Sequence, residues 1–404
     1  MPATLDALPG ENKPKMAEFS SIEPQKLIEK LSHRPYEILD AMITIHTWQS
    51  PPAPSASSRP LPSRISSLGV LDRLPPEITS MILGFLDLPS LAVFARVSHG
   101  ANDMIRSLRQ YQDLLAFAPE AVEALRRTGV IRFHSAAHLH DALRSRRCAT
   151  CIELGEFLFL PTGERCCWQC LRDHPFLRMI SPREAQMYFC LSRRHLRRLT
   201  PFTVIGGEYG IFGGVYDVRQ RPIREQTLFS ARAAVELGLK VHGSAENLAK
   251  ALKMRSLSSE AMITARFLQS GIEVPRNEDL LLMPSMDDVP EDGFFGAASM
   301  PFPSVSGPGE IHYGLWCYGC KFNAGMYMQG LLPQDVLAGI VPPNRNGKRI
   351  LKGLERRARS RESFYEHIRN CYGAREYVTE LERIIARDGE LWEPPREMIP
   401  AGKD

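Results

Sequence analysis

The sequence predicts an α+β protein that is predominantly helical, with an N-terminal three-helix segment followed by a cysteine-rich α+β body. Three observations support this fold class. Apolar residues recur at helical spacing between residues 68 and 111, and paired cysteines recur in the rest of the chain. The first 66 residues are mostly polar and rich in turn-forming residues, so the N-terminus is predicted to be disordered.

Composition restricts the class of protein before any motif is considered. The chain has 404 residues, 44% of them hydrophobic, which is enough for two or three domains with their own cores. Its formal net charge of +4 is far below the basic excess of a dedicated nucleic-acid-binding protein. The N-terminal residues do not have the pattern of a secretory signal, so we expect none, and no apolar run reaches membrane-spanning length. We therefore expect a cytoplasmic or nuclear protein with no membrane partner, whose nine cysteines stay reduced.

The N-terminal region is not uniform. Apolar residues at helical spacing predict one or two short helices within residues 22–48, interrupted at Pro35 because proline cannot continue a helix. Residues 50–67 are a Pro/Ser-rich run with little apolar surface to bury, and they are predicted to be disordered.

Three short helices are predicted between residues 68 and 111. The first carries an apolar stripe at three- and four-residue spacing, formed by Leu71, Leu74, Ile78 and Ile82. Pro75 and Pro76 suit its start, the run "DLPS" at 87–90 begins the second helix, and the third begins at about Ser98. A core this small leaves apolar side chains uncovered, which indicates a binding partner.

This segment resembles an F-box. The usual F-box pattern appears in order: Leu-Pro-x-Glu-Ile at 74–78, an apolar pair at 82–83, Leu-Asp-Leu-Pro-Ser-Leu at 86–91 and Val-Ser at 97–98. The resemblance implies that the segment docks onto the Skp-family adaptor, and through it the cullin, of an SCF ubiquitin ligase. The docking residues that it implies are Leu74, Pro75, Ile78, Ile82, Leu86 and Leu88.

The first cysteine cluster has the spacing of a zinc ribbon. Cys148 and Cys151 form one Cys-x-x-Cys pair, Cys167 and Cys170 form another, and fifteen residues separate the pairs. The intervening residues run apolar and then turn at 161–163, which predicts a β-hairpin that brings the pairs together. Cys166 is an alternative ligand, but its spacing to the last cysteine is less suitable.

A second cluster is predicted from more distant residues. Cys317 and Cys320 form a third Cys-x-x-Cys pair, while His367 and Cys371 are four apart on a predicted helix and share one face of it. Together they would make a zinc site of three cysteines and one histidine, so the chain is predicted to bind two zinc ions. His312 is an alternative ligand, and Cys190 is expected to be a core thiol without a ligand role.

The cysteine motifs extend the resemblance beyond the F-box. "G-x-F-x-x-L-P" and "R-x-C-x-x-C" are matched at 155–161 and 165–170. Together with the later cysteine pair and the helix at 364–371, they resemble a group of F-box proteins from filamentous fungi, over residues 68–378.

These features divide the chain into six parts. The predicted parts are a mostly disordered region at 1–66, the F-box at 67–111, a helical connector at 112–143, a first ribbon-like zinc module with helices at 144–273, a flexible loop at 274–310, and a second helical zinc module at 311–392.

The predicted function is binding rather than catalysis. Four protein ligands fill each predicted zinc site, so no position is left to activate water, and no phosphate loop or nucleophile elbow is present. We therefore predict a non-enzymatic SCF adaptor whose zinc-stabilised body binds an unknown protein substrate. The alternative is a zinc-scaffolded nucleic-acid-binding protein that uses the basic stretches at 191–199 and 344–361.

Overall fold

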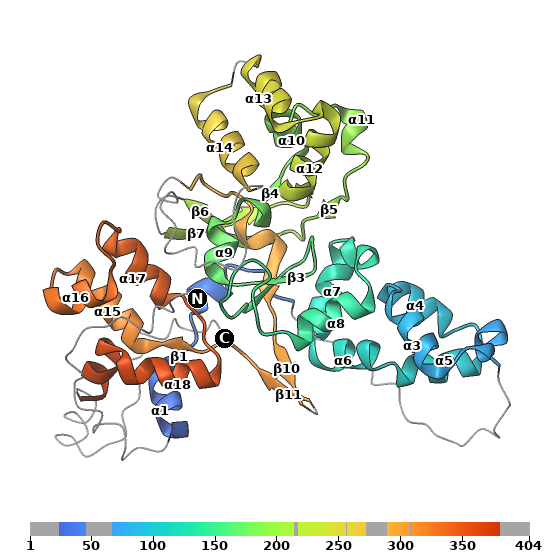
Figure 1. The fold of residues 1–404 in the computed structure, drawn as a ribbon, viewed down its shortest axis with the longest axis horizontal. Helices are drawn as coiled ribbons and strands as arrows, with labels where there is room; N and C mark the ends of the chain where they lie inside the picture. The colour runs from blue at the N-terminus through green and yellow to red at the C-terminus, as the bar shows by residue number, and fades with distance from the viewer. Residues whose placement is uncertain are drawn as a thin grey trace. The chain divides into compact units, whose positions relative to one another are not determined.

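The structure is a computed structural model that describes residues 24–45, 67–213, 217–255, 257–271, 289–307 and 309–379. The disorder predicted for residues 1–23 and 50–66 lies outside the described residues. Helices dominate and several small antiparallel sheets accompany them, so the predicted α+β, mostly helical class is confirmed (Figure 1). In the described part of the chain, no helix is both long and apolar enough to cross a membrane.

The chain forms two compact units. The smaller combines Met1–Arg34 with Gly314–Asp404, and the larger is Pro35–Tyr313. The helices predicted within residues 22–48 are α1, Pro24–Leu31, and α2, Tyr36–Leu39. Helical structure is interrupted between them, and Pro35 lies in this interruption as predicted. They contribute to different units, because the unit boundary falls at this break.

Three helices form where the F-box-like segment predicts them. They are α3, Pro76–Gly84; α4, Leu88–Phe94; and α5, His99–Ser107, and a short 3-10 helix, η1, Gly69–Arg73, precedes them. The Asp87 carboxylate accepts the Ser90 N–H at 2.8 Å and so caps α4, while the Ser98 hydroxyl accepts the Ala101 N–H at 3.1 Å and caps α5. These side-chain caps satisfy amide donors that would otherwise lack a partner, and they fix where each helix begins.

A helical connector follows this segment. Its elements are α6, Arg109–Phe117; α7, Pro119–Arg127; η2, Val130–Phe133; and α8, Ala136–Arg144. The end of the connector is joined to the F-box-like segment by backbone contacts, because Ala136 N–H donates to the Leu86 carbonyl at 2.8 Å and Asp87 pairs with Ser135 in an antiparallel bridge. His140 Nε2 lies 2.9 Å from the Asp113 carboxylate and ties α8 to α6.

A three-stranded antiparallel sheet forms the centre of the first cysteine module. Its strands are β2, Phe157–Phe159; β3, Glu164–Cys166; and β9, Ser299–Pro301, in the order β3-β2-β9. The predicted hairpin between the cysteine pairs is confirmed by the pairing of β2 with β3. Where the sequence predicts a flexible loop over 274–310, the described residues include η5, Phe295–Ala298, strand β9, and strand β10, Ser304–Ser306. Three apolar side chains of this segment are buried: Met300, Phe302 and Val305. Prolines between them led to the prediction of a loop instead.

Helices and small sheets complete the larger unit. The remaining strands are β4, Met179–Ile180; β5, Phe202–Thr203; β6, Gly207–Gly213; β7, Asp217–Ile223; β8, Thr227–Ser230; β10, Ser304–Ser306; and β11, Glu310–His312. The remaining helices are α9, Trp168–Asp173; η3, Pro175–Leu177; α10, Pro182–Tyr188; α11, Arg193–Leu196; α12, Ala231–His242; α13, Ala245–Lys253; and α14, Ser259–Ser270. The helices from α10 to α14 enclose one apolar core, with Phe189, Val235 and Leu268 fully buried in it.

The smaller unit is built around the second cysteine cluster. Its elements are α1; β1, Ser32–His33; β12, Trp316–Cys317; α15, Tyr318–Met328; α16, Gln334–Ile340; α17, Gly347–Glu355; and α18, Arg361–Asn370. β1 pairs with β12, and Leu27 and Leu31 of α1 are buried with Phe364 and Ile368 of α18. A helix from near the start of the chain therefore closes a core whose other members lie about three hundred residues later.

Candidate metal centres and docking surface

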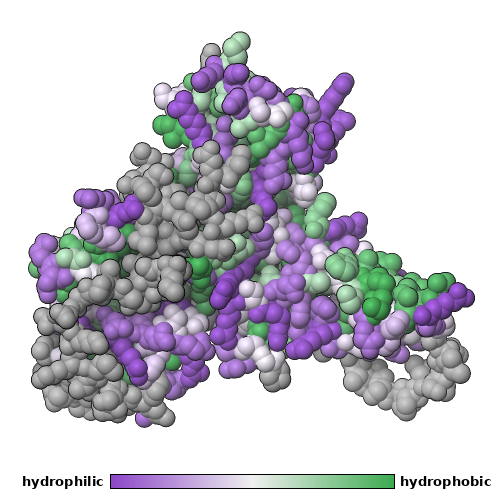
Figure 2. Space-filling model, in the orientation of Figure 1, coloured by the Kyte–Doolittle hydropathy of each residue, from purple (hydrophilic) through white to green (hydrophobic). Residues whose placement is uncertain are grey.

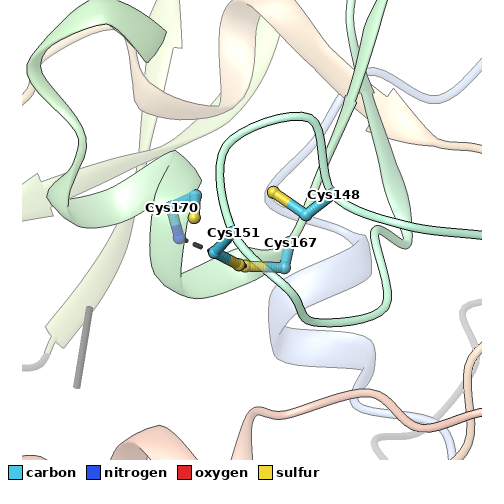
Figure 3. Close-up of side chains that lie close together, drawn as sticks. All are labelled: Cys148, Cys151, Cys167 and Cys170. Carbon is cyan, nitrogen blue, oxygen red and sulfur yellow. Dashed lines mark hydrogen bonds between the residues drawn. The ribbon is translucent and has the colours of Figure 1, made fainter. Parts of the chain in front are cut away.

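The first cluster brings its four predicted ligands together. The sulfur atoms of Cys148, Cys151, Cys167 and Cys170 all lie within 4.8 Å of one another, and all four side chains are buried. Figure 3 shows them pointing toward one another, two from the loop after α8 and two from the start of α9. Cys151 Sγ lies 3.6 Å from Cys167 Sγ. Four sulfurs placed about 2.3 Å from a tetrahedral Zn(II) are about 3.8 Å apart, so the geometry fits zinc.

Backbone amides support these sulfurs. The N–H of Thr150 donates to Cys148 Sγ at 3.4 Å, and the N–H of Glu153 donates to Cys151 Sγ at 3.5 Å. On the other side of the cluster, the N–H of Cys170 donates to Cys167 Sγ at 3.4 Å. A hydrogen bond to sulfur favours the charged thiolate, which is the form that binds a metal. Each Cys-x-x-Cys turn therefore presents donors suited to thiolate ligands.

Hydrogen bonds between the clustered thiols shift the pKa values of three of them. Hydrogen bonds from the Cys151, Cys167 and Cys170 thiols hold the pKa of Cys148 well below its usual range. Hydrogen bonds with Cys148 raise the pKa of Cys167 and of Cys170 well above theirs. A divalent cation would deprotonate all four thiols, because its charge offsets the repulsion between thiolates. The donor set thus fits a zinc ion, whose binding would be coupled to loss of protons.

Arg165 connects the cluster to the surrounding segments. Its buried guanidinium donates to the carbonyls of Ala142, Gly155 and Phe302 at 2.9, 2.6 and 3.0 Å, and also to that of Pro303. Burial lowers the pKa of Arg165 to about 10, so the side chain stays charged at neutral pH. One side chain therefore joins α8, the loop of the first cysteine pair and the segment between β9 and β10.

The second cluster also brings its predicted ligands together. The ligand atoms of Cys317, Cys320, His367 and Cys371 lie within 4.8 Å of one another, with the three cysteines buried and the histidine half-buried. Cys320 Sγ lies 3.1 Å from His367 Nε2. Cys317 precedes α15 and Cys320 lies in its first turn, while His367 is in α18 and Cys371 ends it. Three thiols and one imidazole are a common ligand set for structural zinc.

Thiol hydrogen bonds polarise this cluster as they do the first. Hydrogen bonds from the Cys317 and Cys371 thiols hold the pKa of Cys320 well below its usual range. The hydrogen bond with Cys320 raises the pKa of Cys317 to about 12, and hydrogen bonds with Cys317 and Cys320 raise the pKa of Cys371 well above its usual range. Arg359 Nη2 lies 4.0 Å from Cys320 Sγ, and its positive charge also lowers the pKa of Cys320.

Close backbone packing at the second cluster depends on Gly319. A Cβ at this position would lie 2.2 Å from the Ala374 backbone nitrogen, a distance that no side-chain movement relieves. We expect Gly319→Ala to separate α15 from the helical residues 372–379 and to remove about one zinc ion per chain, measured by elemental analysis of purified protein.

A matched control is present on the same helix. A Cβ at Gly325, also in α15, meets no atom within 4 Å. Gly325→Ala should keep the zinc content and leave stability equal or up to about 1 kcal/mol greater, because alanine favours helix. Equal zinc loss in both variants, or in neither, contradicts this description of the second centre.

The other candidate ligands lie outside both clusters. Cys166 is buried in β3 beside Cys167 but is not one of the grouped ligands. His312 belongs to the larger unit, where its Nε2 lies 2.6 Å from Ser306 Oγ, whereas the second cluster lies in the smaller unit. Cys190 is half-buried and packs against the core of α10 to α14, in line with the expected core thiol.

The F-box-like segment exposes an unusual amount of apolar surface. Eight large hydrophobic side chains are exposed there: Val70, Leu74, Ile78, Met81, Ile82, Phe85, Val93 and Val97. Figure 2 shows the corresponding hydrophobic patch over α3 and α4. Ile78 is 43% exposed and Phe85 is 74% exposed. Exposed apolar side chains gathered on one small domain are typical of a protein-binding surface.

The predicted docking residues differ in exposure. Leu74, Pro75, Ile78 and Ile82 are exposed, and Leu86 is half-buried. Leu88 is only 4% exposed and is part of the helical core, so in this structure its side chain supports the segment rather than lining its surface. Sequence reasoning missed Met81, Phe85 and Val93, because apolar periodicity does not distinguish a core side chain from an uncovered one.

The two basic stretches differ in how they present their charge. In 191–199 the four arginines at 193, 194, 197 and 198 are exposed around α11. In 344–361, Arg349 and Arg359 are buried, and the Lys352 ammonium pairs with Glu355 at 2.7 Å. Charge that is used inside the fold is not available to phosphates, so the second stretch offers little support for nucleic-acid binding.

Comparison with known families identifies one part of the chain. Residues 71–113 match the family model of the F-box domain. No curated protein and no solved structure matches the chain. The resemblance of the cysteine-rich body to F-box proteins of filamentous fungi therefore stays a prediction, as do the predicted domain boundaries.

Proposed function

Because residues 71–113 are an F-box domain, we propose that the chain is a substrate-recognition adaptor of an SCF-type ubiquitin ligase. F-box domains generally bind the Skp-family adaptor, which connects them to the cullin. The observation that supports the proposal most is the exposure of Leu74, Ile78 and Ile82 on the matched segment. The cysteine-rich body would bind a protein substrate, in the cytoplasm or the nucleus.

The mechanism of such an adaptor is proximity. Holding a substrate beside a ubiquitin-charged enzyme raises its effective concentration, and the adaptor supplies no reacting group. Each candidate metal centre offers four protein ligands, so a zinc ion bound there would have no open position for substrate or water. Zinc would contribute folding energy to the body. The chain's own residues would bind the substrate and orient it.

Exposed arginines around α11 favour one competing function, nucleic-acid binding. The test compares retention of the full-length chain on immobilised Skp-family adaptor with retention on duplex and single-stranded nucleic acid at rising salt. We expect adaptor binding that survives moderate salt, since an apolar interface is screened little. Strong, steeply salt-dependent retention on nucleic acid without adaptor binding would replace the proposal with its competitor.

A further inference from the structure

A large aromatic side chain is exposed just outside the F-box domain. Phe133, the last residue of η2, is 57% exposed, twenty residues beyond the matched segment. Its neighbours Ile131 and His134 are buried, and His134 Nε2 bonds to the Leu160 carbonyl at 2.9 Å. The backbone around Phe133 is therefore held firmly while its ring faces solvent. An uncovered ring on a rigid turn is suited to binding a partner at little entropic cost.

The fold places this ring beside the F-box domain. Asp87 and Ser135 pair in an antiparallel bridge. The residues after Asp87 and the residues before Ser135 therefore extend to the same side of the bridge. The first of these is α4 and the second is η2, and the two elements pack against each other. Val93 of α4 is also exposed. The end of η2 thus lies beside α4 of the F-box domain, and each of the two elements carries an exposed apolar side chain.

Exposed cationic side chains lie next to α4 and Phe133 in the sequence. Arg96, which follows α4, and Arg132, which precedes Phe133, are both exposed. Arginines at the edge of an apolar patch favour a partner with acidic groups around an apolar centre, because complementary charge speeds association and fixes orientation.

We propose that Phe133 belongs to the docking surface for the Skp-family adaptor, so that the interface extends past the F-box domain onto the connector. This inference rests on the proposed function. η2 packs against α4 of the F-box domain, and backbone contacts at the Asp87–Ser135 bridge hold the connector against that domain. Binding would therefore fix the connector as well as the F-box.

The test measures the affinity of the full-length chain for purified Skp-family adaptor by isothermal titration calorimetry. Phe133→Ala should weaken binding about tenfold, with zinc content and thermal midpoint unchanged because the ring is exposed. Arg132→Glu should slow association and weaken its salt dependence. Met254→Ala, in an exposed apolar residue at the end of α13, is the matched control and should bind as the parent chain does.

The outcomes separate this inference from the function on which it rests. If Ile78→Asp abolishes binding and Phe133→Ala leaves it unchanged, the extended surface is wrong and the F-box proposal stands. If the parent chain shows no binding, both fall together. A change in self-association with unchanged adaptor affinity, seen by sedimentation, would assign the surface to a second copy of the chain and overturn the inference.

Discussion

Cys167→Ala is expected to lower the zinc content from two ions per chain to one and to unfold the module around β2, β3 and β9. The sulfur of Cys167 lies 3.6 Å from that of Cys151 and accepts the Cys170 N–H in the first turn of α9, so its removal opens the cluster at the helix start. Structural zinc contributes about 10 kcal/mol or more of apparent binding free energy in zinc-finger peptides, comparable with the whole stability of a domain. Elemental analysis and thermal unfolding measure both effects.

The neighbouring cysteine gives a closely matched control. Cys166→Ala makes the same chemical change one residue earlier, in a thiol that is equally buried but outside the cluster. We expect two zinc ions and a loss of about 1 kcal/mol from the small void. If the zinc contents of the two variants are reversed, the hairpin register and the choice of Cys167 as ligand are both wrong.

Ile78→Asp is expected to weaken adaptor binding by at least about 30-fold. The side chain lies on the exposed face of α3 at 43% exposure, so burying a carboxylate there on binding costs about 2 kcal/mol or more. The unbound chain should keep its fold, since the Ile78 side chain is exposed before binding. Calorimetric titration with the adaptor gives the affinity, and circular dichroism verifies the fold.

Leu83 is also on α3 but is buried, so its substitution serves as the control for a loss of stability without a change at the exposed face. Leu83→Ala should reduce the stability of the helical segment by about 2–5 kcal/mol, and should weaken binding only as far as the domain unfolds. Unchanged adaptor affinity in Ile78→Asp would show that α3 does not form the docking face.

Local patterns predicted much of both sites. The F-box helices begin close to the predicted starts, because proline preference and side-chain caps act within one turn. The four-cysteine cluster follows from two tight turns joined by a hairpin, and the second cluster from an i, i+4 pair on one helix. In each case, short-range geometry restricts where the ligand atoms lie.

Other features depend on contacts between distant segments, and the sequence does not indicate them. α1 covers the second cluster although about three hundred residues separate them, and Arg165 bonds to carbonyls of Phe302 and Pro303 far along the chain. β9 adds to the hairpin through a segment whose prolines suggested a loop. Every residue has the same backbone carbonyl, so the sequence does not indicate which carbonyls will accept hydrogen bonds from a buried guanidinium.

Native mass spectrometry of the full-length chain mixed with the Skp-family adaptor tests the central claim most directly, because one spectrum reports partner and metal together. We expect a one-to-one complex whose mass includes two zinc ions. A chain that carries two zinc ions but forms no complex would contradict the adaptor function, and a complex without zinc would contradict the metal-stabilised body.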